Sequence, residues 1–237
     1  MSRPHIDRQG QKKLLVFPGV GSPENLFYSD VYTLIEEGAR RFAFDEIRIC
    51  SWPGQKRTSN DKLTLHGAVS IAKEVIKEAE NHSESYSIFC RSFGTIVCAK
   101  ALNEIAVSGL DRIILWGPPP YSVLWGLFKR DFETTRKKAL EKGTRIGGEF
   151  FNSITPIETL LPISSLNKKT LIATGTRDKY CPPIFIDYLK SLKGCGDIHT
   201  EVVQDAEHEV SYKCPENVRE EYLQKLLSEN DSKILSS

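Results

Sequence analysis

A serine between a short apolar run and a helix-forming run is the first feature of this 237-residue chain that is able to do chemistry. Ile88-Phe89-Cys90 reads as a buried strand, and residues 95–102, rich in Ala, Ile and Val, read as a helix. Ser92 stands between them in Cys90-Arg91-Ser92-Phe93-Gly94, which matches the nucleophile elbow Gly-x-Ser-x-Gly except at its first position. Cysteine is among the smallest replacements for that glycine, so the segment predicts a serine on a tight strand-to-helix turn.

A serine on such a turn is suited to act as a nucleophile, provided that a base removes its proton. The turn exposes the hydroxyl oxygen and sets it beside the first amides of the following helix, which are able to stabilise an oxyanion. The simpler alternative is that Ser92 only caps the helix, because serine is a favoured N-cap residue. The rest of the chain has to decide between these two roles.

A serine nucleophile needs a histidine as its base. Only His208 follows a predicted strand in a loop, and it is therefore the candidate base. The other histidines lie in the polar start of the chain, in or at the end of a predicted helix, or at the last predicted strand, and are expected to be structural or surface residues: His5, His66, His82 and His199.

An acid that orients the base is expected after another strand. Asp178 stands in Gly175-Thr176-Arg177-Asp178, directly after the apolar run at 170–174, and is the candidate. A plain turn or N-cap role is the alternative, since aspartate is common in turns. Asp205 is the rival acid, but it stands very close to His208 in the sequence.

Apolar runs and helical stripes alternate along the whole chain. Strands are predicted at 12–17, 46–50, 88–90, 111–116, 170–174 and 201–203, and helices at 27–44, 63–79, 95–102, 184–192 and 216–227. This alternation predicts an α/β fold, with a mainly parallel, doubly wound sheet covered by helices on both faces. Ligands bind at the carboxyl ends of the strands in such sheets, which is where Ser92 and Asp178 stand.

Residues 118–165 interrupt the alternation, since a simple crossover needs far fewer residues. They predict a small helical lid, inserted between core segments 1–117 and 166–237, and an ordinary helical excursion is the alternative. Its aromatic residues Trp125, Phe128 and Phe151 are candidates to line an acyl pocket. Its basic residues outnumber its acidic ones and, together with Arg91, they hint at an anionic substrate; a solvated helix face is the alternative.

The composition fits an ordinary globular protein, with 40% hydrophobic and 27% charged residues and a net charge of +1. This charge gives no reason to expect nucleic acid as a partner. No apolar run approaches the roughly 18 residues of a membrane span, and residues 1–13 lack an apolar signal-peptide core, so a cytoplasmic protein is expected. The six cysteines form no Cys-x-x-Cys pair or zinc-like cluster, and there is no phosphate-loop pattern. No metal and no cofactor are therefore expected, and no oligomeric state is predicted.

These motifs, in their order along the chain, resemble the α/β-hydrolase family. The resemblance runs from the Pro18-Gly19 turn to the final helix, and it includes the order Ser92, Asp178, His208. It implies that Val20, which follows Pro18-Gly19 in place of the family's His-Gly segment, offers a backbone N–H to an oxyanion hole. Phe93 N–H, directly after the nucleophile, is implied as the second donor.

The resemblance further implies a serine hydrolase that cleaves a carboxylic ester or thioester of a small acyl substrate through an acyl-enzyme. Two alternatives stay open. An acyltransferase would use the same three residues with an acceptor other than water. A non-catalytic protein would keep the fold as a ligand receptor.

Overall fold

One parallel sheet forms the centre of the molecule. A computed structural model describes residues 12–20, 26–52, 63–82, 85–119, 168–184, 186 and 198–228. Within these residues, six strands pair in parallel in the order β2-β1-β3-β4-β5-β6. The strands are β1 (Lys12–Phe17), β2 (Glu46–Ile49), β3 (Ser85–Arg91), β4 (Leu110–Trp116), β5 (Lys169–Gly175) and β6 (Ile198–Val203). The parallel α/β sheet predicted from the sequence is confirmed.

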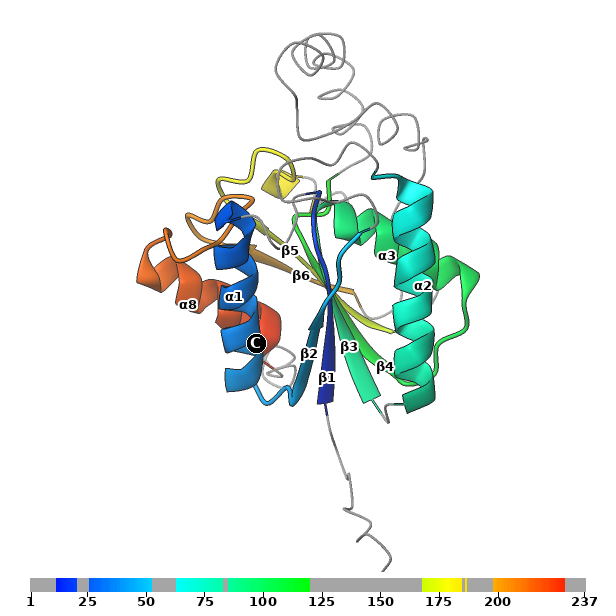
Figure 1. Cartoon of the computed structure of the whole chain (residues 1–237). Coiled ribbons are helices and arrows are strands. Elements are labelled where there is room, and N and C mark those ends of the chain that lie inside the picture. The colour runs from blue at the N-terminus through cyan, green and yellow to red at the C-terminus, as the bar shows by residue number, and fades with distance from the viewer. Residues whose placement is uncertain are drawn as a thin grey trace, which may run out of the picture.

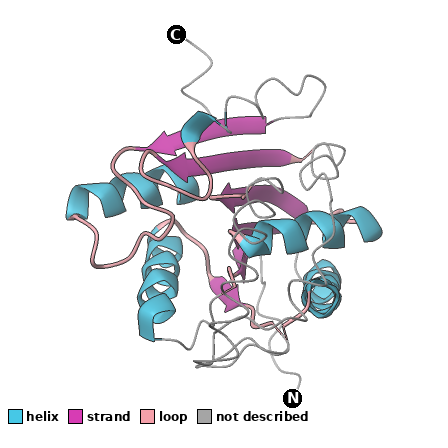
Figure 2. Cartoon of the chain, turned by 90° about the horizontal axis from the view of Figure 1, so that it is seen from above, coloured by secondary structure: helices cyan, strands magenta, loops and turns pink. Residues whose placement is uncertain are grey.

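Helices cover both faces of this sheet, as the alternation of elements predicted. Helices α1 (Leu26–Arg41) and α8 (Glu216–Leu227) lie on one face, and α2 (Leu65–His82) and α3 (Phe93–Glu104) lie on the other (Figures 1 and 2). None of the helices in the described part of the chain is long and apolar enough to cross a membrane.

The alternation of side chains along each strand builds a separate core on each face. In β1, Leu15 and Phe17 join the α2–α3 core, the buried cluster between the sheet and these two helices. Leu14 and Val16 join the α1–α8 core on the opposite face. All four side chains are fully buried, which explains why this central strand reads as a continuous apolar run rather than as an alternating pattern.

The strand order reverses its direction between β1 and β3. The chain passes from β1 to β2 on one side and then returns to β3 on the other side of β1. The chain leaves β1 through α1 toward β2 and leaves β3 through α3 toward β4, so these two crossovers run in opposite directions from neighbouring strands. Parallel sheets bind ligands in the crevice at this type of position, which is the point where Pro18 and Ser92 follow their strands.

The sequence predicted strands β3 and β6 only in part. Strand β3 covers Ser85–Arg91, whereas the apolar run predicted a strand only at 88–90. The edge strand β6 was predicted only at its carboxyl end. This strand begins at Ile198, whereas the apolar run predicted a strand only from Glu201. Among the described residues it pairs only with β5, and most of its residues are partly exposed, so its amino end carries no apolar run. The helix predicted at 184–192 lies largely outside the described residues, as does most of the predicted lid, so the proposed division into core and lid stays a prediction.

Arg112 joins the middle of the sheet to the end of the last helix. Its side chain donates hydrogen bonds to the carbonyl oxygens of Leu227 (2.8 Å) and Ser228 (3.1 Å). These carbonyls belong to the last turn of α8 and its cap, where helix carbonyls lack partners within the helix. Tyr222 of the same helix packs its ring edge-on against Trp116 of β4, with ring centroids 4.7 Å apart.

Candidate active site

Ser92 occupies a strained backbone position between β3 and α3. Its φ of 50° and ψ of −119° lie where residues other than glycine are rarely found, and such strain is typical of functional turns. Its N–H donates to the Trp116 carbonyl at 3.0 Å, and its own carbonyl accepts a hydrogen bond from Thr95 N–H at 2.9 Å. Within the described residues its hydroxyl makes no capping hydrogen bond to α3, so the capping alternative gains no support.

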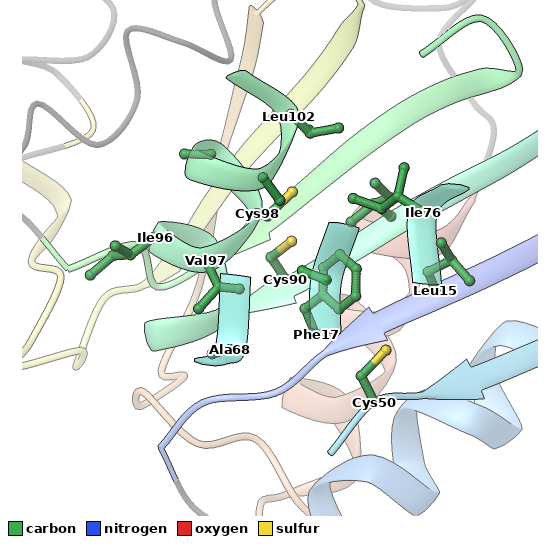
Figure 3. Close-up of a cluster of buried hydrophobic side chains, with 14 of the residues drawn as sticks. Leu15, Phe17, Cys50, Ala68, Ile76, Cys90, Ile96, Val97, Cys98 and Leu102 are labelled. Carbon is green, nitrogen blue, oxygen red and sulfur yellow. The ribbon is translucent and has the colours of Figure 1, made fainter. Parts of the chain in front are cut away.

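The two small positions of the elbow have different physical demands. A Cβ atom on Gly94 would lie 2.2 Å from the Phe17 carbonyl oxygen, so only glycine allows α3 to start this close to β1. Cys90 instead points into the α2–α3 core and is fully buried. Figure 3 shows its sulfur among apolar side chains of β1, α2 and α3, beside the sulfur of Cys98. Burial raises the pKa of the Cys90 thiol, and Cys98 adds to the rise, so a neutral thiol fills the place of the motif's first glycine.

Asp178 and His208 form a buried pair beside this turn. His208 Nδ1 lies 2.8 Å from Asp178 Oδ2, and the aspartate side chain is fully buried. Asp178 Oδ1 accepts hydrogen bonds from the N–H groups of Tyr180 (2.8 Å) and Cys181 (2.9 Å), which fix the carboxylate. A carboxylate only accepts hydrogen bonds, so His208 donates through Nδ1, and Nε2 is the ring atom able to act as a base.

Two glycines allow the loops that carry this pair to come together. Gly117, directly after β4, has a φ of +54°, and a Cβ atom there would lie 2.8 Å from the His208 ring and 2.9 Å from Asp178. A Cβ atom on Gly175, at the end of β5, would lie 2.0 Å from the Ala206 carbonyl oxygen. Any side chain at either position would displace the histidine loop from the aspartate loop.

The segment Trp116-Gly117 connects Ser92 with the Asp178–His208 pair. Ser92 N–H binds the Trp116 carbonyl, and the Trp116 indole Nε1 donates to the His208 carbonyl at 2.9 Å. Gly117 lies against the His208 ring. The three residues predicted to do chemistry therefore gather around one dipeptide at the carboxyl end of β4.

The loop after β1 lies against the elbow. A Cβ atom on Gly19 would lie 3.4 Å from the Ser92 Cβ, and the Trp52 indole holds this loop by donating to the Pro18 carbonyl at 3.1 Å. Val20 follows Gly19 directly, and Phe93 is the first residue of α3. Both residues predicted as oxyanion donors are thus neighbours of Ser92 along the backbone or across the loop.

Arg91, predicted to bind substrate, is buried and paired with a carboxylate instead. Its side chain is 2% exposed and forms an ion pair with Glu209, with Nη2 2.8 Å from Oε1. The other predicted substrate contacts lie outside the described residues: Trp125, Phe128 and Phe151.

The structure also brings residues to the site that the sequence analysis did not assign. The Tyr180 ring lies 4.9 Å from the His208 ring between centroids, and the tyrosine side chain is half exposed at the rim. The sequence could have indicated this tyrosine, because Tyr180 stands two residues after the candidate acid Asp178. Glu209 stands directly after His208. Tyr32 lies in the middle of α1, and its hydroxyl oxygen accepts a hydrogen bond from Gly19 N–H at 3.1 Å. Nothing in the sequence around Tyr32 indicates this role.

Comparisons with known proteins support the fold and leave the activity open. No family model matches the chain, and no curated protein matches it. The solved structures that resemble it include α/β-hydrolase domain-containing protein 10 from mouse, with a TM-score of 0.53, 12% identity, and coverage of 83% of this chain and 81% of the mouse chain.

Two further structures are described as ester-cleaving enzymes. A structure from a study of carboxylesterases of the thaumarchaeon Nitrososphaera gargenis has a TM-score of 0.61 and 13% identity, and covers 84% of this chain and 83% of its own. The monoacylglycerol lipase of Paleococcus ferrophilus has a TM-score of 0.55 and 18% identity, and covers 90% of this chain and 91% of its own. The chain thus has the α/β-hydrolase fold.

Proposed function

We propose that this protein is a serine hydrolase that cleaves a carboxylic ester or thioester of a small acyl substrate. The observation that carries the proposal is the buried Asp178–His208 pair, 2.8 Å apart, beside a serine with strained backbone angles. Pairing of a histidine with a buried acid is what a serine nucleophile needs for activation, and few structural roles require it at a strand-end crevice. The carboxylesterase and lipase with the same fold support the choice of reaction class.

In the proposed reaction, His208 Nε2 removes the Ser92 proton as the serine oxygen attacks the carbonyl carbon. Asp178 holds the histidine in the tautomer with the proton on Nδ1 and stabilises the imidazolium that forms. His208 then gives its proton to the leaving alcohol or thiol, and an acyl-Ser92 intermediate remains. Water, activated by His208, releases the acid and restores the serine.

The negative oxygen of the tetrahedral intermediate needs donors that are already in place. We assign this role to the backbone N–H groups of Val20 and Phe93, which flank Ser92 on the β1 loop and at the start of α3. One such donor contributes about 3 kcal/mol of transition-state stabilisation. The dense packing of Gly94 against Phe17 fixes these two segments relative to each other.

The substrate is proposed to enter at the carboxyl edge of the sheet. Tyr180, half exposed beside His208, is placed to contact it, and Trp125, Phe128 and Phe151 stay proposed as lining of the acyl pocket. Arg91 is not part of this contact set, because its guanidinium is buried against Glu209.

The proposal is tested by labelling with a fluorophosphonate probe, which modifies only an activated serine. Wild-type protein should be labelled at Ser92, and the Ser92→Ala and His208→Ala variants should not, with all three folded by circular dichroism. Labelling that persists in Ser92→Ala would refute the assignment of the nucleophile. A folded wild type without labelling would instead favour a receptor without catalysis.

A second measurement separates hydrolysis from acyl transfer. Wild-type protein that has not been exposed to the probe is incubated with p-nitrophenyl esters of increasing chain length, with and without a primary alcohol as acceptor. Release of free acid in both cases supports the hydrolase. Ester formation that outcompetes water at millimolar alcohol would make the protein an acyltransferase.

A further inference from the structure

We propose that Arg91 is a positioning residue, which ties together the three loops that carry the oxyanion donor, the nucleophile and the base. This inference rests on the proposed serine hydrolase function and goes beyond it, since it assigns a role to a side chain that touches no reacting atom. Arg91 is the last residue of β3 and precedes Ser92 directly. Its guanidinium is buried on the side of the sheet that carries α1 and α8, close to Tyr32 and Tyr222.

The first connection runs from Arg91 to the histidine loop. Nη2 of Arg91 lies 2.8 Å from Glu209 Oε1, and Glu209 follows His208 directly. The His208 carbonyl is held separately by the Trp116 indole, and the ring is held by Asp178. The backbone is thus fixed at the histidine carbonyl and again through the next side chain, which restricts the direction of the ring.

The second connection runs from Arg91 to the loop after β1. A Cβ atom on Gly19 would lie 3.1 Å from Arg91 Nη1, so the guanidinium packs directly against this residue. Tyr32 accepts the Gly19 N–H and lies within hydrogen-bonding reach of Arg91. Burial raises the pKa of Tyr32, and the Arg91 charge partly offsets this rise, which reflects how closely the two groups lie. Gly19 precedes Val20, the proposed oxyanion donor.

An arginine suits this position better than any other residue. Its planar fork directs one nitrogen to Glu209 and presents another to Gly19 at the same time, whereas the lysine ammonium is a single point charge. A buried guanidinium is costly unless it is paired, so the loops must close around it for the protein to fold. The geometry therefore couples correct folding of this cluster to correct placement of Ser92, His208 and Val20.

The test compares rates of inactivation by fluorophosphonate–rhodamine, separated into kinact and KI. The variants are Arg91→Met, Arg91→Lys, Glu209→Gln and the double variant Arg91→Met/Glu209→Gln. Arg41→Met is the matched control, because Arg41 also pairs with a glutamate, Glu220, at 2.6 Å, but on the exposed surface. Thermal unfolding of each variant identifies the fraction that is folded.

We expect Arg91→Met and Glu209→Gln to lower kinact by about 10- to 100-fold, since displacement of reacting groups by about 1 Å costs this much. KI should stay within about threefold of the wild-type value, because no substrate contact is lost. The kinact of Arg91→Lys should fall between the values of Arg91→Met and the wild type. In the double variant, kinact should fall by less than the product of the two single-variant factors, because both charged groups are removed together and neither is left unpaired. Arg41→Met should match the wild type.

Wild-type kinact in folded Arg91→Met and Glu209→Gln would overturn the inference, and so would a loss confined to KI, which would make Arg91 a substrate contact. Should Arg91→Met fail to fold, Glu209→Gln decides by the same criteria. Failure of the proposed function is distinguishable, because the wild type itself would then go unlabelled, and this result would overturn both proposals.

Discussion

The two faces of β3 differ most where the strand ends beneath Ser92. Cys90 enters the α2–α3 core, where its neutral thiol lies among aliphatic and aromatic side chains (Figure 3). Arg91 enters the opposite face, where it meets Glu209 and Tyr32. The apolar face fixes how close α3 comes to the sheet, while the charged face joins specific loops to one another.

This difference teaches that the two faces contribute to the site in different ways. Apolar packing is not directional, so side chains of similar volume replace one another at modest cost. A buried ion pair is directional and becomes unfavourable when one partner is removed. Substitutions on the two faces should therefore lower the free energy of unfolding by different amounts, from the largest loss on the charged face to almost no effect for the buried thiols.

Replacement of Arg91 by Met should lower the free energy of unfolding by about 3 kcal/mol, because it leaves the partly buried Glu209 carboxylate without its cation. Urea unfolding followed by tryptophan fluorescence measures this loss. The exposed pair Arg41–Glu220 supplies the control, since Arg41→Met should cost under about 1 kcal/mol. Equal losses for the two substitutions would remove the energetic distinction between the buried and exposed pairs.

On the apolar face, Cys90→Ser should cost about 2 kcal/mol, because it places a hydroxyl among side chains that offer it no strong acceptor. Cys90→Ala is the control and should cost about 1 kcal/mol, since only one heavy atom is lost. The same urea titration measures both. A serine variant as stable as the alanine variant would show that the surroundings of Cys90 offer the hydroxyl a hydrogen-bond acceptor.

Two tyrosines beside Arg91 allow a finer comparison on the charged face. Tyr32→Phe should cost about 1 kcal/mol, because Gly19 N–H loses its acceptor. Tyr222→Phe should stay within about 0.5 kcal/mol of the wild type, since the buried Tyr222 hydroxyl makes no hydrogen bond within the described residues. Thermal and urea unfolding of both variants check this. The opposite ranking would mean that the Tyr222 hydroxyl has the more important partner.

Thiol chemistry should show almost no effect in the folded protein. Burial raises the pKa values of Cys50 and Cys181 to about 12, so about one thiol in ten thousand is ionised at pH 8. Cys90 and Cys98 are buried as well. Iodoacetamide followed by peptide mass spectrometry should modify these four cysteines only after unfolding in urea. The partly exposed Cys214 is the internal control. Modification of Cys90 in the native state would contradict a closed apolar face.

The sequence predicted some strands over their full length and others only in part. Strand β1 is buried on both sides and shows a continuous apolar run, so its bounds were predicted as Lys12–Phe17, as observed. Strand β6 pairs only with β5 in the part of the chain that the structure describes. Its partly exposed amino end, with Ile198 followed by His199 and Thr200, carries no such run. Strand β3 is buried on both faces as well, yet only residues 88–90 were predicted, because the polar residues Ser85, Ser87 and Arg91 interrupt its apolar run.

The candidate site was predictable where a motif is local and unpredictable where it is assembled by the fold. Ser92 and Asp178 each follow an apolar strand and were found from their own neighbours. The pairing of Arg91 with Glu209 joins two distant segments, and neither segment indicates the other. For this reason the sequence assigned Arg91 to the substrate, whereas the structure buries it against Glu209.

Arg112 has a consequence for the cooperativity of unfolding. A helix at the margin of a domain ordinarily opens locally before the rest of the domain does. Here the last carbonyls of α8 bind a side chain of the central strand β4. The same helix packs Tyr222 against Trp116, whose indole holds the His208 carbonyl. Loss of the final turn is thus transmitted along β4 to the histidine loop, so α8 and the crevice should open as one unit rather than in sequence.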